Sequence, residues 1–268
     1  MKDVIFINPP FEYPYATDIK QGVRLDNRNR QPLDLAYAAA VLLENGFSAD
    51  IIDANILRME FDEIIKDVEK ENPTFVVITT SPMDRWECPY LDISAPLALM
   101  ARLKSEIPDT KVIATGPHGT TTPDWIFQKS SDFDVLIRGE PEYVTLDLAK
   151  FFVSGEGNLE QIKGISYRNN GNVVHNVGRE LIQDLDALPF PAYHLLPMDR
   201  YLASGSHYNL TGRVQHSILV STRGCPHSCT YCLRGMWGRQ FRRRSPQKIV
   251  DEIEMIVNNY GINYFYFI

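Results

Sequence analysis

The sequence contains 268 residues, which is long for one average domain and suits two, at roughly 150 residues per domain. Hydrophobic residues make up 44% of the chain and charged residues 23%, with 16 glycines and 17 prolines, a composition typical of a soluble globular protein and not of a disordered one. The formal net charge of −7 argues against a protein that binds nucleic acid, because phosphate-neutralising proteins are usually basic.

No apolar run approaches the roughly 18 residues of a membrane span, and the start of the chain lacks the apolar core and cleavage site of a signal peptide. We therefore expect a cytoplasmic protein with reduced thiols. Three of its four cysteines, Cys225, Cys229 and Cys232, stand close together. In a reducing compartment such a cluster indicates metal ligands or catalytic residues rather than disulfides. The isolated Cys88 is predicted to be structural or incidental.

The first half of the chain alternates strand and helix patterns. The predicted strands are Val4–Ile7, Phe47–Ile52, Phe75–Thr79, Val112–Thr115 and Val135–Ile137. A helix is predicted from Pro32 to Gly46 with an apolar face that includes two alanines, and another is predicted from Phe61, ending before Pro73. Continuous apolar strands favour a parallel sheet covered on both faces. We predict a five-stranded doubly wound α/β domain over roughly residues 1–155.

Ligands of such sheets bind beyond the carboxyl ends of the strands. The polar and small residues expected there are Asn8, Asp53–Asn55, Thr79–Ser81, Gly116–Thr120 and Gly139–Glu142. No GxGxxG or GxxxxGK[ST] motif is present, so neither a dinucleotide site nor a P-loop is supported. The long loop from Phe11 to Gln31 carries Arg24, Arg28 and Arg30, and its pattern suits a lid and an ordinary solvated loop equally well.

Asn169-Asn170-Gly171 between two short apolar runs predicts a hairpin appended to this domain. Leu188-Pro189-Phe190-Pro191 interrupts both helix and strand patterns and marks the best domain boundary. We therefore predict a first domain over 1–180, a linker over 181–212 and the beginning of a second domain over 213–268.

The three cysteines follow a predicted buried strand, Ser217–Ser221, with the spacing CxxxCxxC. Thiolates at this density select zinc or an iron–sulfur cluster. Structural zinc sites usually draw four ligands from two separated pairs, and no second pair follows, so an iron–sulfur cluster is favoured over zinc. Three thiolates on a cubane cluster leave one iron open to a substrate or cofactor.

The segment Thr222–Cys232, TRGCPHSCTYC, closely resembles the cluster loop of radical S-adenosylmethionine (radical SAM) enzymes, including the aromatic Tyr231 before the last cysteine. Other motifs look like the cobalamin-binding domain that precedes this module in one large subgroup: Pro32-Leu33, Leu35-Ala36, Asp53, Gly116-Pro117-His118, Thr120 and Gly139-Glu140-Pro141-Glu142. Leu188–Pro191 and Arg242–Pro246 also fit the subgroup. The resemblance extends over the whole chain and implies a Rossmann-like domain followed by the start of a partial TIM barrel.

This resemblance implies a [4Fe–4S] cluster on Cys225, Cys229 and Cys232, with SAM on the open iron and Tyr231 beside SAM. One electron from the cluster would cleave SAM to a 5′-deoxyadenosyl radical that takes hydrogen from an unactivated carbon. In this subgroup cobalamin commonly passes a methyl group to the substrate radical, although some members catalyse cyclisations or rearrangements. The residues implied at cobalamin are Asn8, Thr80, Ser81, Gly116, His118, Thr120, Gly139, Glu140 and Glu142.

The same resemblance implies a small-molecule, lipid or natural-product substrate and an external electron donor such as flavodoxin or ferredoxin. No DxHxxG motif is present, so His118 is not expected to ligate cobalt. We expect His118 to line the pocket, the alternative being a loop histidine that forms local hydrogen bonds.

Near the end of the chain, Ser245 and Pro246 predict the start of a helix that Gly261 ends. The apolar run Asn263–Ile268 then begins another buried strand, and because such a strand needs partners on both sides, we infer a fragment of a longer protein. The basic run Arg239, Arg242, Arg243 and Arg244 is interpreted as a solvated face, or alternatively as a clamp for a carboxylate or phosphate of substrate or cofactor.

Three functions are compatible with these patterns. The leading hypothesis is a cobalamin-dependent radical SAM enzyme, specifically a methyltransferase, which as a fragment would be inactive alone. The first rival is a binding module that holds a corrinoid without turnover. The second is a zinc or electron-transfer protein with a closed metal site.

Overall fold

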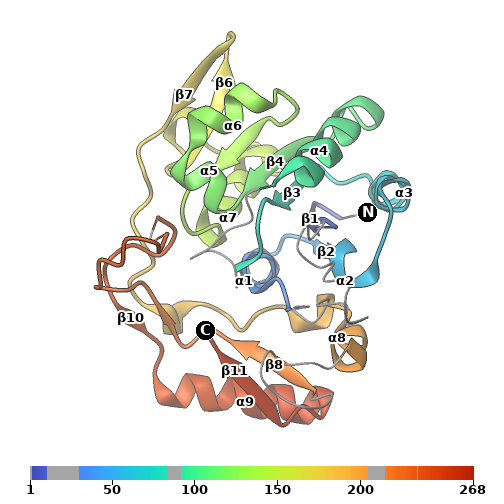
Figure 1. Cartoon of the computed structure of the whole chain (residues 1–268). Coiled ribbons are helices and arrows are strands. Elements are labelled where there is room, and N and C mark those ends of the chain that lie inside the picture. The colour runs from blue at the N-terminus through green and yellow to red at the C-terminus, as the bar shows by residue number, and fades with distance from the viewer. Residues whose placement is uncertain (1, 11–29, 84–91, 205–214, 234) are drawn as a thin grey trace, which may run out of the picture.

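The computed structural model describes residues 2–10, 30–83, 92–204, 215–233 and 235–268 (Figure 1). Cys88, Arg24 and Arg28 lie outside these residues, so the predictions for them are not addressed by the structure. In the part of the chain that is described, no helix is long and apolar enough to cross a membrane.

The first domain is built on one mixed sheet of seven strands in the order β2-β1-β3-β4-β5-β6-β7. These strands are β1 (Val4–Asn8), β2 (Ala49–Asp53), β3 (Phe75–Thr79), β4 (Lys111–Thr115), β5 (Val135–Ile137), β6 (Ile165–Asn169) and β7 (Asn172–His175). The first five strands pair in parallel, as their continuous apolar sequences predict. The predicted hairpin is β6–β7, and it extends the same sheet antiparallel to β5.

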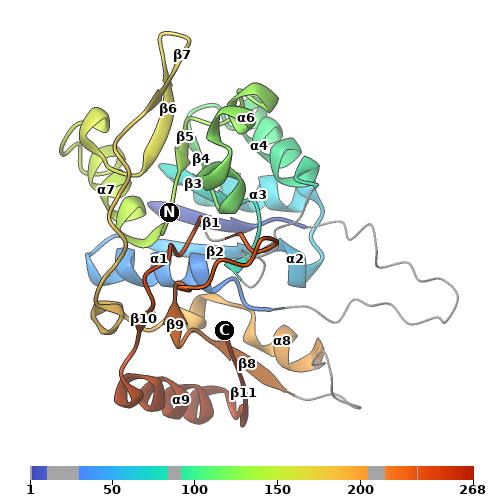
Figure 2. The same ribbon diagram turned by 60° about the vertical axis from the view of Figure 1, so that its left-hand side comes forward.

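Helices cover both faces of this sheet (Figure 2). They are α1 (Leu33–Glu44), α2 (Ala54–Leu57), α3 (Phe61–Glu71), α4 (Ser94–Glu106), α5 (Pro117–Thr121), α6 (Pro123–Lys129) and α7 (Glu142–Phe152). Alternate strand residues point to opposite faces, so Phe6 packs in one core with α1 and α7 while Ile5 packs in the other with α3, α4 and α6. The doubly wound domain is thus as predicted.

The second part of the chain is a strand–helix–strand unit. Strands β8 (His216–Leu219) and β11 (Tyr264–Phe267) pair in parallel, and α9 (Pro246–Tyr260) connects them. This is the repeating unit of a TIM barrel, which the sequence predicts. Between β8 and α9 a short ladder joins β9 (Thr222–Arg223) to β10 (Arg242–Arg243) in antiparallel pairing.

Helix α1 lies between the sheet of the first domain and the β8–α9–β11 unit (Figure 2). The sequence predicts one apolar face, but every residue from Leu33 to Leu42 is buried. Its outer face meets residues of the second domain, including Ile218 and Leu219, in one continuous core. A helix that is apolar on all sides is expected to be buried on all sides, and here two domains share it.

The segment predicted as a linker, 181–212, is described up to residue 204. It holds two 3₁₀ turns, Leu185–Ala187 and Tyr193–Leu195, and helix α8 (Met198–Ser204); a further 3₁₀ turn, Leu159–Gln161, precedes β6. Tyr193 is fully enclosed in the shared core, and the Ala192 N–H donates to the Ala36 carbonyl of α1 at 3.0 Å. The segment is therefore packed across the two domains, while the domain limits drawn from the sequence stay a prediction.

Candidate functional site

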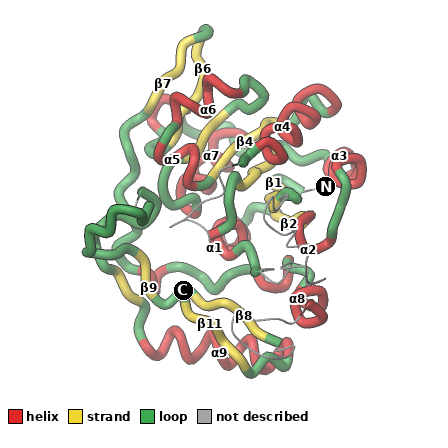
Figure 3. The backbone as a smooth tube through the Cα atoms, in the orientation of Figure 1, coloured by secondary structure: helices red, strands yellow, loops and turns green. Residues whose placement is uncertain are grey.

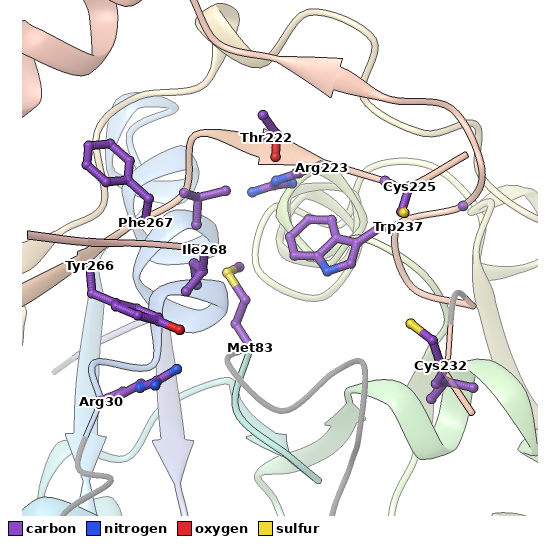
Figure 4. Close-up of a pocket in the computed structure, with 14 residues that line it drawn as sticks. Arg30, Met83, Thr222, Arg223, Cys225, Cys232, Trp237, Tyr266, Phe267 and Ile268 are labelled. Atoms are coloured by element: carbon purple, nitrogen blue, oxygen red, sulfur yellow. The ribbon is translucent and has the colours of Figure 1, made fainter. Parts of the chain in front are cut away.

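A cavity of about 310 Å³ lies at the carboxyl ends of β8 and β11, where the second domain faces the first (Figure 4). The second domain contributes Val220, Thr222 and Arg223, the strand end Tyr266–Ile268, and part of the loop 224–241, here called the cluster loop. The first domain contributes Arg30 and Met83. The guanidinium of Arg30 stacks on the Tyr266 ring, 4.6 Å from its centroid, so the two domains meet directly at the cavity.

The predicted metal ligands are in the cluster loop. Cys225 and Cys232 line the cavity, and Figure 4 shows both on the side opposite Arg30 and Tyr266. Cys229 and Tyr231 are exposed, and none of the three cysteines is joined in a disulfide. Within the described residues, no three His, Cys, Asp or Glu side chains are close enough together to hold a metal ion. The donor set of three thiols on one short loop nevertheless fits an iron–sulfur cluster chemically.

The cluster loop begins at a glycine that its geometry requires. Gly224 has φ of +86°, and a Cβ at this position would lie 2.1 Å from the backbone carbonyl oxygen of Gln240. The next N–H, of Cys225, donates to the carbonyl of Gly238 at 3.3 Å, which closes the base of the loop. Only glycine combines this left-handed conformation with so close a backbone approach.

The residues predicted to bind cobalamin come together at the carboxyl edge of the sheet. Thr80 follows β3, Gly116 and His118 follow β4, and Gly139 follows β5. The Thr80 hydroxyl donates its one hydrogen to the Thr115 carbonyl at 3.0 Å. His118 Nδ1 lies 3.0 Å from the Thr80 hydroxyl oxygen, so in this second hydrogen bond Nδ1 is the donor and the hydroxyl the acceptor. His118 thus forms the local hydrogen bond that the sequence offered as the alternative, and its role at a cobalamin pocket stays a prediction.

Two more of these residues tie the loops after β4 and β5 together. The Thr120 hydroxyl donates to the Gly116 carbonyl at 3.0 Å and accepts from the Gly139 N–H at 3.0 Å. Gly116 has φ of +114°, and a Cβ there would lie 2.7 Å from the Thr80 hydroxyl oxygen. Ser81 is fully buried next to Thr80. The edge therefore presents backbone and small polar groups close to one another.

This edge also contains buried polar oxygens that, among the described residues, have no hydrogen-bond partner. They are Asn8 Oδ1, Asp34 Oδ1 and Thr115 Oγ1. Buried polar groups in proteins are nearly always satisfied, so such a cluster indicates a ligand with hydrogen-bond donors. The amide side chains of a corrinoid are donors of this kind. The residues present therefore fit cobalamin.

Two buried acids at this edge were not singled out as titrating groups by the sequence. Burial raises the pKa of Asp34 to about 7, against opposing hydrogen bonds from backbone N–H groups and from Thr79, whose hydroxyl lies 3.3 Å from Oδ2. Burial also raises the pKa of Asp53 to about 6, against hydrogen bonds from Tyr201 and from the Asn8 amide at 2.8 Å. Tyr201 belongs to α8, so Asp53 ties the connecting segment to the sheet.

Asp34 should make the stability of the protein depend on pH. Its pKa in the folded chain lies above its ordinary value of 3.8, so folding favours the protonated acid and stability falls as the pH rises from about 4 to about 7. The loss attributable to Asp34 is on the order of 4 kcal/mol and is complete above that window. We expect D34N to flatten the pH dependence of the free energy of unfolding, measured by urea denaturation between pH 5 and pH 8.

The control for this prediction is D109N, because Asp109 is an exposed acid of the same domain. D109N should follow the wild-type curve. A D34N curve with the wild-type slope would show that Asp34 is ionised at no cost in the folded protein.

Glu140 and Glu142, which the resemblance places at cobalamin, form ion pairs with arginines of the second domain. Glu140 accepts from Arg223 at 3.1 Å and from Arg242 at 2.8 Å, and Glu142 accepts from Arg223 at 2.6 Å. All four side chains are buried. Desolvation by burial raises the pKa of Glu142, and the nearby Arg223 charge opposes that rise. These contacts do not test whether cobalamin also touches this loop.

The prediction that the basic run forms a solvated face was wrong for two of its four arginines. Arg239 and Arg243 are exposed as expected of a solvated face, but Arg242 and Arg244 are buried. Arg242 pairs with Glu140, and Arg244 forms an ion pair of 2.5 Å with Glu252 of α9, whose other oxygen accepts from Tyr193 at 2.7 Å. The arginines do clamp carboxylates, but these belong to the protein itself, 102 residues away in the case of Arg242.

Two family models match the chain. The model of the B12 binding domain matches residues 29–149, and that of the Radical SAM superfamily matches residues 219–268. An uncharacterized methyltransferase of Pyrococcus horikoshii is 32% identical over 86% of this chain and 47% of its own length. An anaerobic magnesium-protoporphyrin IX monomethyl ester cyclase of Synechocystis is 27% identical over 98% of this chain and 48% of its own length.

A cytidylyl-2-hydroxyethylphosphonate methyltransferase of Streptomyces wedmorensis is 27% identical over 88% of this chain and 50% of its own length. The chain thus spans about half the length of these curated relatives. Among solved structures, the cobalamin-dependent SAM radical enzyme OxsB superposes with a TM-score of 0.76 at 18% identity, covering 100% of this chain and 34% of OxsB.

The radical SAM methyltransferase TsrM of Kitasatospora setae superposes with a TM-score of 0.70 at 16% identity, covering 98% of this chain and 47% of TsrM. These likenesses confirm the fold, with a cobalamin-type Rossmann domain followed by radical SAM strands. The two matched family models and the 32% identical relative show that the chain belongs to the radical SAM family whose members carry a B12-binding domain.

Proposed function

We propose that the protein contributes to a cobalamin-dependent radical SAM methyltransferase that alkylates an unactivated carbon of a small molecule. The observation that carries this proposal is the cavity between the domains. Cys225 and Cys232 face it from the cluster loop, while Arg30 and Met83 face it from the Rossmann domain. A cavity of about 310 Å³ at this position is of the size that small ligands occupy.

The residues of the chain would divide the work as follows. Cys225, Cys229 and Cys232 would hold the [4Fe–4S] cluster, leaving one iron for SAM, and Tyr231 would lie beside SAM. The sheet edge, where one side-chain oxygen each of Asn8 and Asp34 has no hydrogen-bond partner among the residues that the structure describes, would hold cobalamin through its amides. When bound, the cluster supplies the electron that cleaves SAM and cobalamin supplies the methyl group.

The apolar part of the cavity lining has a role of its own. Met83, Val220, Trp237 and Ile268 border the space between the cysteines and the Rossmann domain. Such a lining excludes water from a reactive site and limits side reactions. It also suits a substrate with an apolar portion, as expected for a lipid or natural product.

Methyl transfer is preferred over cyclisation on the names of the relatives. Those from Pyrococcus horikoshii and Streptomyces wedmorensis are named methyltransferases, whereas the Synechocystis relative is named a cyclase. A cytoplasmic location and reduction by a flavodoxin or ferredoxin complete the proposal. The exposed Cys229 supports the latter, because an electron donor must approach the cluster closely.

Anaerobic reconstitution with iron, sulfide and hydroxocobalamin tests the proposal. We expect about four irons and four sulfides per chain, as in a [4Fe–4S] cluster, together with cobalamin that co-elutes in gel filtration. Addition of SAM should change the electron paramagnetic resonance spectrum of the reduced cluster. Stoichiometric zinc in place of iron would support a closed metal site and overturn the proposal, and iron without bound cobalamin would overturn its cobalamin-dependent part.

A further inference from the structure

Arg223 connects the Rossmann domain to the cluster loop through buried charges. It ends β9, two residues before Cys225, and its side chain lines the cavity. Its guanidinium donates to Glu140 at 3.1 Å and to Glu142 at 2.6 Å, both of which follow β5 of the first domain. Figure 4 shows Arg223 above the cavity, between Thr222 and Trp237.

Two aromatic rings and two carboxylates hold this guanidinium in place. Its Cζ lies 4.6 Å from the centroid of Trp237, a residue of the cluster loop, and 5.2 Å from that of Tyr37, a residue of α1. The neighbouring Arg242 donates to Glu140 at 2.8 Å and to the Trp237 carbonyl at 3.0 Å. The base of the cluster loop is therefore held by two arginines whose partners lie partly in the other domain.

The charges of this group balance. Arg223 and Arg242 carry two positive charges, Glu140 and Glu142 two negative ones, and all four side chains are buried. Buried charges interact far more strongly than exposed ones, since little water screens them. Removing any one member therefore leaves a net charge next to the cluster loop, whereas removing one arginine and one glutamate together restores neutrality.

We propose that Arg223 is a positioning residue for the iron–sulfur cluster, and that Glu140 and Glu142 of the Rossmann domain set the net charge that the cluster experiences. Reduction adds a negative charge to the cluster. Loss of the Arg223 charge should therefore make reduction harder, and loss of a carboxylate should make it easier. The B12-binding domain would in this way help to determine the potential of a cofactor bound by the other domain.

The experiment measures the midpoint potential of the cluster in the reconstituted full chain for R223Q, E142Q and the double variant R223Q/E142Q. The potential should shift downward in R223Q, upward in E142Q, and back toward the wild-type value in the double variant. R243Q is the matched control, because Arg243 lies on the same short ladder as Arg242 but is exposed. Its potential should equal that of the wild type.

A purely structural role would move the two single variants in the same direction or leave both unchanged, and either result overturns the proposal. If R223Q does not fold, the comparison of E142Q with the wild type still tests the proposal. Glutamine has nearly the volume of glutamate, and its side-chain oxygen can still accept a hydrogen bond from Arg223. A potential of E142Q equal to the wild-type value would then reject the proposal. This inference rests on the proposed cluster site, but different results reject the two proposals. A wild-type chain that binds no iron rejects the proposed function. An intact cluster whose potential is the same in all variants rejects only the role of the buried charges.

Discussion

Replacing any one of Cys225, Cys229 and Cys232 by alanine is expected to reduce the iron content of the reconstituted protein to less than about a tenth of the wild-type value. Each of the three thiolates would supply one iron ligand, and a cubane cluster with only two protein ligands is readily lost. Iron and sulfide analysis and the visible absorption of the anaerobic protein measure the effect.

C88A is the control for the cysteine variants, because Cys88 is the remaining cysteine and is predicted to be no ligand. It should retain the wild-type amount of iron. Equal loss of iron in all four variants would mean that the ligand set is wrong. Full retention in C229A, whose sulfur is not part of the cavity lining, would reduce the set to the two cysteines that face the cavity.

G224A is expected to cost about 2–4 kcal/mol of folding free energy and most of the bound iron. The cost has two sources. A residue with a Cβ is strained at φ of +86°, and this Cβ would lie 2.1 Å from the carbonyl oxygen of Gln240, so the backbone at the base of the cluster loop has to move. Denaturation of the cluster-free protein in urea gives the free energy, and iron analysis after reconstitution gives the second effect.

G171A separates these two sources. Gly171 has a very similar φ of +84°, but a Cβ there would meet no atom within 4 Å. We expect G171A to cost only about 1 kcal/mol, the conformational part, and to bind iron normally. Equal losses of folding free energy in the two variants would show that the close approach to Gln240 contributes nothing.

Features that depend on residues close together in the chain could be predicted from the sequence. Helix α9 is one: the Ser245 side chain accepts from the Lys248 N–H at 3.2 Å at its start, and Gly261 ends it with φ of +69°. The parallel pairing of the first five strands follows in the same way from their continuous apolar sequences. Helix capping and hydrophobic periodicity depend on residues that are close together in the sequence, so they can be recognised before the fold is known.

Features that join distant segments could not be predicted. Arg242 and Arg244 read as part of a solvated run because their partners, Glu140 and Glu252, are recognisable only after the domains have packed. Asp34 looks like an ordinary acid in the first turn of a helix, a favourable place for a negative charge, but in the fold it is buried and lies beside Thr79 of β3, 45 residues away in the sequence. Sequence patterns therefore located the cluster loop and the sheet edge but not the charges that connect them.

Since helix α1 has protein on all sides, neither domain can be excised without damage to the other. A chain cut after residue 180 would lose Tyr193, Ile218 and Leu219, and would expose to water the α1 surface that these residues cover. Exposed apolar area of this kind promotes aggregation. Exchange of the Rossmann domain for another would therefore also require new partners for the α1 surface in the second domain, because this interface belongs to the hydrophobic interior of both domains.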